Sequence, residues 1–474
     1  MSLEDNIIYQ CNAEAFGGGE LGRERLERLN SLHVAVVGAG LTGQMVLASL
    51  YGLGVGNIYL FDNSEKILRN DRGFLHEKAT ARPGTPKDKS ILSELERIDP
   101  DRSIRSRHGK FCEAFAHGLN PDVIIETTNI PQSKEAVLNY AAKSRSKPLY
   151  VISLASDAST SAIGSYYPKR RSKFVEHTSL DLDALLHREF ERKRQGGYTS
   201  GIVSGLATEE VRKIAFRYDE DDRLIDRNQR LVYNTYSSTR DSLEDDLRRN
   251  PIPRYNDKKV LVVGAGALGN WAEIYLSKLG LERVDFVDPD VAEEKNLNRQ
   301  IELRGTIGES KAKTLSKRMR SNDRNIKSTG YFGSVGETGE NILPVSMILE
   351  KGYDAILGCV DSKSARIWMD QFCTQHGIPY IDGGTDPTTG QVAVYVPGET
   401  RRVSDMVDIS SLGETNNSCQ DRPNPSVVMS NEITSGLMIG ELCHVFNNDE
   451  YSNPITRPLK YDNRMKNRIK LSKF

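Results

Sequence analysis

The chain has 474 residues, which is too long for one ordinary hydrophobic core, so we expect at least two domains. Its net charge of −1 gives no reason to expect nucleic-acid binding, and no apolar run is long enough to span a membrane. The start of the chain does not resemble a signal peptide, and six cysteines without a C-x-x-C pair favour a reducing cytoplasm.

The first glycine-rich turn follows a short charged helix, which we expect over residues 21–30. A β-branched strand over residues 33–37 leads into a G-x-G-x-x-G turn, and the next apolar strand ends at Asp62. Glycine lets the main chain approach a phosphate, and an acid at the second strand end can accept hydrogen bonds from ribose. The turn therefore predicts a nucleotide-binding βα unit. Its glycines are Gly38, Gly40 and Gly43.

The second half of the chain repeats the first. Lys259 to Asp288 aligns without gaps onto His33 to Asp62, and the Asp122-Val-Ile-Ile segment recurs as Asp354-Ala-Ile-Leu. We therefore predict an α/β protein with two tandem Rossmann-like domains, residues 1–250 and 251–474, joined by a charged linker near 241–257. The matching glycines of the second copy are Gly264, Gly266 and Gly269.

Polar residues follow the second turn in a pattern that a dinucleotide site does not need. Two acids, Asp288 and Asp290, precede Asn296-Leu-Asn298-Arg299-Gln300 and Lys311. Arginine and lysine beside a phosphate turn suggest a charge-dense triphosphate. A further acid, Asp361, follows the strand-like run 355–360, and parallel strands end on one edge of their sheet. The pattern thus favours ATP with Mg²⁺ held by Asp361.

The order of these motifs resembles the ThiF/MoeB adenylyltransferase superfamily, which includes ubiquitin-activating enzymes. The resemblance covers roughly residues 260–391 and rests on four further motifs. They are Asn296-Leu-Asn-Arg-Gln300, Gly308-Glu-Ser-Lys311-Ala312, Val360-Asp361-Ser362 with Ala365-Arg366, and Tyr380-Ile-Asp-Gly-Gly-Thr385. A chance fit to all of them in the right order is improbable, whereas one glycine motif alone would be weak evidence.

The resemblance implies adenylation of a C-terminal carboxylate on a ubiquitin-like or sulfur-carrier protein or a peptide, with ATP and Mg²⁺. In that reading the glycine turn and Asp288 hold the nucleotide, and Asp290 helps to organise the site. Asn298, Arg299 and Lys311 contact the phosphates, and Asp361 binds the metal. Relatives with zinc have a C-x-x-C pair after the Pro397-Gly-Glu-Thr400 segment, which this chain lacks, so no zinc is expected.

Each of these residues also has a plainer explanation. Asp290 could cap a helix, Arg299 could form a structural ion pair, and Asn296 and Gln300 could be surface or turn residues. Lys311 opens a basic run that alone would indicate a solvated helix face, and Asp361 alone would be an ordinary strand-end cap.

The first copy departs from the family pattern. Asp62-Asn-Ser replaces the acid pair, and Thr127-Thr-Asn129 stands where the second copy has Asp361, although Lys87 keeps a possible phosphate lysine. We therefore expect a degenerate copy that completes an internal pseudo-dimer; nucleotide binding there, and a homodimer of the whole chain, stay open. The charged insert 169–195 is expected to be solvated, or else to dock an acidic protein face.

Two features of the relatives have no certain counterpart. Many relatives donate an arginine across the dimer to ATP, and here it is absent, or replaced by Arg23, or supplied by Arg240 across another interface; Arg25 also lies nearby. Relatives also form a thioester or persulfide, for which Cys419 near Arg422 is the candidate, while Cys359 and Cys373 look like core residues.

Two other functions remain as alternatives. An NAD(P)-dependent oxidoreductase would share the glycine turn, but Arg299, Lys311 and Asp361 argue against it. A non-catalytic scaffold could retain nucleotide without turnover.

Overall fold

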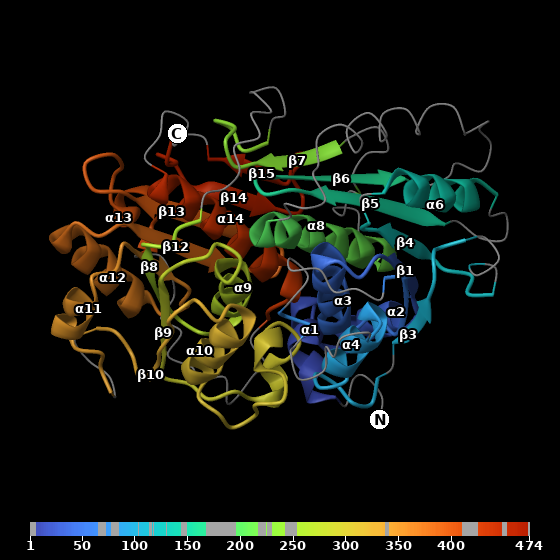
Figure 1. The fold of residues 1–474 in the computed structure, drawn as a ribbon, viewed down its shortest axis with the longest axis horizontal. Coiled ribbons are helices and arrows are strands. Elements are labelled where there is room, and N and C mark those ends of the chain that lie inside the picture. The colour runs from blue at the N-terminus through green and yellow to red at the C-terminus, as the bar shows by residue number, and fades with distance from the viewer. Residues whose placement is uncertain are drawn as a thin grey trace.

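The computed structural model describes the following residues: 6–64, 73–76, 85–102, 104–112, 116, 118–128, 130–143, 149–166, 196–216, 224, 230–241, 254–336, 341–409, 425–447 and 453–472. Each half of the chain builds one sheet with flanking helices, and the halves pack side by side (Figure 1). This confirms the α/β class with two tandem Rossmann-like domains. The insert 169–195 and most of the linker, 242–253, lie outside the described residues.

The first sheet has the strand order β3-β2-β1-β4-β5-β6-β7 within the described part of the chain. The strands from β3 to β5 are parallel, and β6 and β7 extend the sheet in antiparallel fashion. Its strands are β1 His33–Val37, β2 Asn57–Asp62, β3 Arg105–His108, β4 Val123–Glu126, β5 Tyr150–Ser156, β6 Thr160–Tyr166 and β7 Arg230–Asn234. Its helices are η1 Ile7–Tyr9, α1 Gln10–Ala15, α2 Gly19–Ser31, α3 Leu41–Leu53, α4 Lys87–Leu95, α6 Pro131–Lys143 and α8 Gly197–Ala215.

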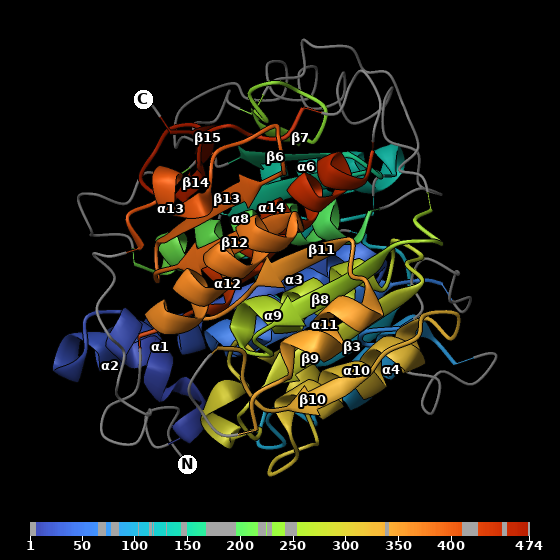
Figure 2. The ribbon, with the colours of Figure 1, turned by 90° about the vertical axis from the view of Figure 1, so that its left-hand side faces the viewer.

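The second sheet repeats this order as β10-β9-β8-β11-β12-β13-β14-β15, again parallel up to β12. Helices α11 and α12 cover its outer face (Figure 2). Its strands are β8 Lys259–Val263, β9 Arg283–Asp288, β10 Gly330–Phe332, β11 Ala355–Gly358, β12 Tyr380–Thr385, β13 Thr389–Tyr395, β14 Leu459–Asp462 and β15 Ile469–Leu471. Its helices are α9 Ala267–Leu276, η4 Glu294–Asn296, η5 Ile301–Leu303, α10 Lys311–Asn322, α11 Val345–Lys351, α12 Lys363–His376, α13 Val403–Met406 and α14 Val428–Phe446.

The repeat extends to single hydrogen bonds. The Asp122 carboxylate accepts the backbone N–H of His33 at 3.0 Å, and the Asp354 carboxylate accepts that of Lys259 at 2.8 Å. Asp122 directly precedes β4, and Asp354 directly precedes β11. Each hydrogen bond therefore ties the start of that strand to the first strand of its unit, β1 or β8. The segment Asp122-Val-Ile-Ile and its repeat Asp354-Ala-Ile-Leu therefore make the same contact between strands in both sheets.

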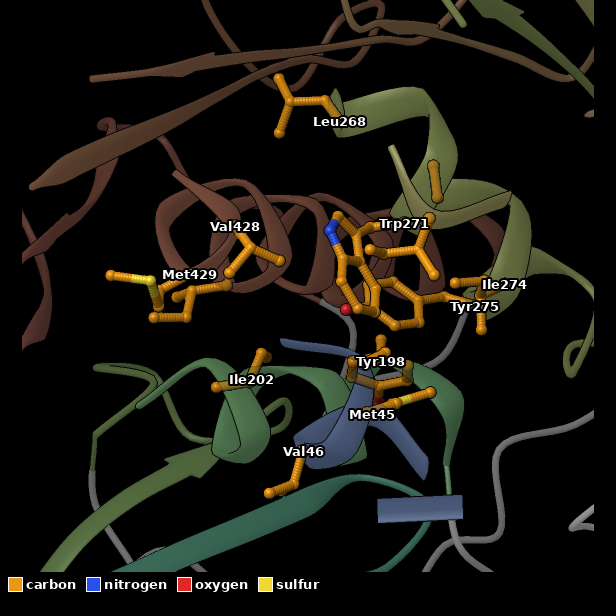
Figure 3. Packing of buried hydrophobic residues seen from close by; sticks show 14 of the residues in the cluster. Met45, Val46, Tyr198, Ile202, Leu268, Trp271, Ile274, Tyr275, Val428 and Met429 are labelled. Atoms are coloured by element: carbon orange, nitrogen blue, oxygen red, sulfur yellow. The ribbon is translucent and has the colours of Figure 1, made fainter. Parts of the chain in front are cut away.

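Helices from both copies share one core. Side chains of α3 and α8 meet those of α9 and α14 in a single buried cluster (Figure 3). The copies are joined by contacts of α8 with α14 and α9 and of α3 with α14. Such apolar burial is the main favourable term in packing, so separating the copies would expose a continuous core. The labelled residues are Met45, Val46, Tyr198, Ile202, Leu268, Trp271, Ile274, Tyr275, Val428 and Met429.

The copies also exchange buried ion pairs. Arg240, just after β7 of the first copy, pairs with Glu441 on α14 of the second. Arg468, just after β14, pairs in return with Glu210 on α8 of the first copy at 3.4 Å. Both arginines have a positive φ, 64° and 55°, so the two hairpins place them in the same unusual backbone conformation. Within the described part of the chain, no helix is long and apolar enough to cross a membrane.

Candidate functional site

The second glycine turn combines two tightly packed glycines with one open position. Gly264 has φ +98°, and a Cβ there would collide with the carbonyl oxygen of Cys359. A Cβ at Gly269 would collide with the carbonyl oxygen of Gly264. A Cβ at Gly266, the residue before α9, would meet no atom of the described residues within 4 Å. Gly264 and Gly269 thus shape the turn, and Gly266 leaves room for a ligand at the start of the helix.

Asp288 holds this turn from the end of β9. Its carboxylate accepts the backbone N–H of Ala265 at 2.6 Å and that of Asp290 at 2.8 Å. Burial raises the pKa of Asp288 to about 6 against the opposing effect of the nearby Lys311 ammonium. Each carboxylate oxygen has a further lone pair, so the same acid can fix the turn and accept a hydrogen bond from ribose.

Lys311 lies almost wholly buried at the start of α10, next to Asp290. Its Nζ is 2.9 Å from Asp290 Oδ2, and its side chain is 8% exposed whereas that of Asp290 is 63% exposed. The helix that follows Asp290 in the chain is η4, and its N-cap residue is Glu293. The two plainer explanations were therefore wrong, because Lys311 is not on a solvated helix face and Asp290 is not a helix cap. The pair places an ammonium group beside the turn, with an acid that a phosphate could displace.

The Asn298-Arg299 segment is buried and faces the first copy. Asn298 Nδ2 donates to Asn12 Oδ1 at 2.7 Å and to the Ser426 carbonyl at 3.2 Å. Arg299 Nη1 donates to Asn298 Oδ1 at 2.7 Å and to the Lys295 carbonyl at 3.2 Å. Within the described residues Arg299 therefore bonds to neutral oxygens, rather than forming the structural ion pair considered from sequence.

The neighbours of this segment are also buried. Asn296 completes the capping box of the short helix η4, because its side chain accepts the backbone N–H of the N-cap residue Glu293 at 3.1 Å. Gln300 is buried, and its Oε1 accepts no hydrogen bond from the described residues. The surface explanation for Asn296 and Gln300 is therefore wrong. Residues 296–300 are therefore all buried and do not form an exposed turn.

Asp361 is exposed just beyond β11. The residue before it is held in place by Arg366. Arg366 donates to the Val360 carbonyl at 2.7 Å and forms a 2.6 Å ion pair with Asp382. Sequence reasoning noted Arg366 only as part of a motif and missed Asp382 as its partner. In the described part of the chain, no three His, Cys, Asp or Glu side chains converge as a metal cluster. One exposed carboxylate still fits Mg²⁺, which usually takes one or two carboxylates together with nucleotide phosphates.

A family model supplies the decisive comparison. The model described as "ThiF family" matches residues 15–253 and again residues 252–473. The chain belongs to the ThiF family. The two matches together cover nearly all of the sequence and confirm the tandem resemblance.

Similarity to curated proteins places this ThiF-family chain near activating enzymes. It is 29% identical over 187 residues to SUMO-activating enzyme subunit 2 of Dictyostelium discoideum, covering 39% of the chain and 27% of that protein. It is 33% identical over 141 residues to adenylyltransferase and sulfurtransferase MOCS3 of the same organism, covering 29% and 32%. It is 25% identical over 263 residues to ubiquitin-like modifier-activating enzyme 1 of Oryctolagus cuniculus, covering 50% and 24%. The matched region is thus a third or less of each relative's length.

The first ThiF copy keeps the framework of the site. The Asp62 carboxylate accepts the backbone N–H groups of Ala39 and Ser64, each at 2.7 Å. The backbone N–H of Lys87 donates to the Ser64 carbonyl at 3.3 Å, as that of Lys311 does to Asp290 at 3.0 Å. Lys87 is therefore the counterpart of Lys311. Asn129, which aligns with Asp361, lies outside the described residues.

Each copy has a buried ion pair after its fourth strand, but the acid of the pair lies on a different strand in the two copies. Lys134 occupies the place of Arg366, but its partner is Glu126 on β4, with Nζ 4.0 Å from Oε2. Strand register places Glu126 beside Ser153, where the second copy has Gly358 beside Asp382. Burial raises the pKa of Glu126 and of Asp382, while the neighbouring cation opposes this rise in each case. The acid of the buried pair therefore lies on β4 in the first copy and on β12 in the second.

The arginine candidates lie in different surroundings. Arg240 is buried and bound to Glu441, so the idea that it acts across a different interface was wrong. Arg25 donates to the Phe16 carbonyl and lies 5.4 Å from the centroid of the Phe216 ring. Arg23 is exposed on α2, and its role as a substitute stays untested.

Four described cysteines are buried, Cys112 is partly exposed, and the candidate nucleophile Cys419 lies outside the described residues. Cys359 and Cys373 are buried, which confirms them as core residues, and burial raises the pKa of both thiols. A buried thiol with a raised pKa is a poor nucleophile. Cys419 and Arg422 lie in the stretch 410–424, outside the described residues, so a thioester at Cys419 remains a prediction from sequence.

Proposed function

We propose that the second ThiF copy, residues 251–474, adenylates the C-terminal carboxylate of a ubiquitin-like protein, a sulfur-carrier protein or a peptide. A carboxylate oxygen attacks the α-phosphorus of ATP, and the bond from that phosphorus to the bridging oxygen breaks. An acyl-adenylate forms and pyrophosphate leaves. The names of the relatives, which include activating enzymes and an adenylyltransferase, support this reaction.

The arrangement around Gly266 carries the proposal. Open space at Gly266 faces the start of α9, and Asp288 ties this turn to Asp290, which in turn pairs with Lys311. Backbone amides and a buried ammonium suit the negative charge of a triphosphate. Catalysis of phosphoryl-group chemistry depends mainly on positioning and charge stabilisation, which these groups can provide.

Each residue takes one role in the proposed site. The turn of Gly264, Gly266 and Gly269 and the Asp288 carboxylate would hold the nucleoside and its phosphates, while Asp290 organises Lys311. Asn298, Arg299 and Lys311 would contact the phosphates. Asp361 would hold Mg²⁺, which when bound neutralises phosphate charge. The first copy would act as the degenerate half of an internal pseudo-dimer, and Cys419 could then accept the acyl group as a thioester with release of AMP.

Pyrophosphate exchange tests the proposal directly. The chain is incubated with ATP, Mg²⁺, labelled pyrophosphate and a panel of small carrier proteins or peptides with a free C-terminal carboxylate. Label should enter ATP only with a true substrate, and C-terminally amidated peptides should give none. Asp361→Ala should abolish exchange, whereas Asp257→Asn, an exposed acid before β8, should leave it intact.

The outcomes separate the three readings of the sequence. Unchanged exchange in Asp361→Ala would remove this residue from the site. ATP binding without exchange for any tested carboxylate would favour a nucleotide-holding scaffold. Enhanced NADH fluorescence that ATP cannot displace would favour the oxidoreductase alternative.

A further inference from the structure

A chain of buried hydrogen bonds connects the first copy to Arg299. Asn12 on α1 donates through Nδ2 to the Gly52 carbonyl at 2.8 Å and the Leu53 carbonyl at 3.2 Å. Asn12 Oδ1 accepts from Asn298 Nδ2 at 2.7 Å, and Asn298 Oδ1 accepts from Arg299 Nη1 at 2.7 Å. Asn12 and Asn298 are each 0% exposed, so water does not compete for these bonds.

Asn12 determines which way the amide groups in this series of hydrogen bonds point. Two carbonyl oxygens need donors, so the NH₂ group of Asn12 must face Gly52 and Leu53, and its oxygen must face Asn298. The NH₂ group of Asn298 must then face Asn12 and the Ser426 carbonyl, and its oxygen is left for the Arg299 guanidinium. The end of α3 thus determines which way the amide beside Arg299 points.

The backbone supports the same connection. A Cβ on Gly52 would collide with the carbonyl oxygen of Asn298, so the end of α3 packs directly on this loop. Cys11, next to Asn12, approaches the Lys295 carbonyl with its Sγ at 4.0 Å. Both the main chain and the side chain of the 295–299 segment are therefore held by residues of the first copy.

We infer that Asn12 is a positioning residue for ATP binding by the second copy: through Asn298 it orients Arg299 toward the phosphates. This inference rests on the proposed role of Arg299 in the ATP site. It assigns the degenerate copy a direct part in the site beyond completing the fold. Asn12 itself does not touch the nucleotide.

A double-mutant cycle on ATP affinity tests the inference. Isothermal titration of the full chain with ATP and Mg²⁺ compares Asn12→Ala, Arg299→Ala and the double variant, and needs no carboxylate substrate. Loss of a buried hydrogen-bonded partner should weaken ATP binding about tenfold in Asn12→Ala. In the Arg299→Ala background the same change should have no further effect, because Asn12 acts only through Arg299.

Two more variants separate positioning from general damage. Asn12→Leu keeps roughly the size of the side chain but removes the oxygen that accepts from Asn298, so it should also weaken ATP binding, which matters if Asn12→Ala does not fold. Ser49→Ala removes another hydrogen bond between the copies, from Ser49 Oγ to Glu432 at 2.6 Å, and should leave ATP affinity unchanged. Its melting temperature shows what a purely structural loss looks like.

Specific results would overturn the inference and leave the proposed function standing. Additive losses of affinity in Asn12→Ala and Arg299→Ala, or unchanged affinity in Asn12→Leu, would show that Asn12 does not act through Arg299. If instead Arg299→Ala binds ATP like the native chain, the proposed role of Arg299 fails first. Pyrophosphate exchange that depends on Asp361 would still support the reaction in either case.

Discussion

Arg240 and Glu441 lie 201 residues apart in the sequence and form a bidentate ion pair that joins the two copies. Arg240 Nε lies 2.8 Å from Glu441 Oε1, and Nη2 lies 3.1 Å from Oε2. Burial alone would raise the pKa of Glu441, but the Arg240 charge and its hydrogen bonds outweigh burial and lower it. The carboxylate therefore stays ionised inside the protein, and removing its partner would leave a buried charge without compensation.

Removal of one member of this pair should destabilise the protein strongly. Arg240→Ala is expected to lower the free energy of unfolding by about 3–5 kcal/mol, because Glu441 would lose its cation in a buried setting. Urea denaturation followed by circular dichroism measures the change. Glu24→Gln, in the exposed Glu24–Arg28 pair, serves as the control and should cost less than about 1 kcal/mol. Similar losses in both variants would contradict the structural role.

Glu432 is buried between the two copies and should make the free energy of unfolding depend on pH. Burial raises the pKa of Glu432 well above its ordinary 4.5, and the neighbouring hydroxyl groups of Ser49 and Ser204 are uncharged. The native state therefore keeps a proton that the unfolded chain releases above about pH 4.5, so this residue lowers stability as pH rises. Glu432→Gln abolishes that titration.

The measurement compares the native chain with Glu432→Gln from pH 4.5 to pH 8. Relative to the native chain, the variant should gain unfolding free energy with increasing pH, by at most about 1.4 kcal/mol per unit. A difference that stays constant over this range would show that Glu432 is ionised in the folded protein.

Two glycines of the same turn should respond differently to alanine. Gly264→Ala imposes φ +98° on a residue with a side chain and drives its Cβ into the Cys359 carbonyl, so it should cost roughly 1–3 kcal/mol of stability or more. Gly266→Ala meets no protein atom and should leave the melting temperature unchanged while weakening ATP binding. Thermal denaturation and ATP titration of both variants check this. Unchanged ATP affinity in Gly266→Ala would place the nucleotide elsewhere.

Lys311 should contribute to nucleotide affinity through its charge. Lys311→Met keeps most of the buried stem but removes the ammonium group paired with Asp290, and charged hydrogen bonds are worth about 1.5–3 kcal/mol. ATP affinity should therefore fall by roughly 10- to 150-fold. Lys313→Met, an exposed lysine two residues later on the same helix, is the matched control and should bind ATP normally. Equal affinities for the two variants would exclude the phosphate role of Lys311.

The sequence by itself determined the tandem fold and the position of each turn. The spacing from Gly264 to Asp288 encodes one strand, one helix and the next strand, and that short unit closes locally around the Ala265–Asp288 hydrogen bond. Because the first half repeats this spacing, the sequence also places Asp62 at the end of the second strand of its unit, where its carboxylate accepts the backbone N–H of Ala39.

Only the tertiary structure decided which polar groups are buried and what they meet. The basic run at Lys311 gives no local sign that its first lysine is covered, because periodicity does not say which face of a helix another element will reach. Asn12 and Asn298 lie 286 residues apart, and Arg240 and Glu441 meet across two copies. Such partners follow from how whole sheets and helices pack, since a buried amide or charge must find its hydrogen-bond partner wherever packing brings one within reach.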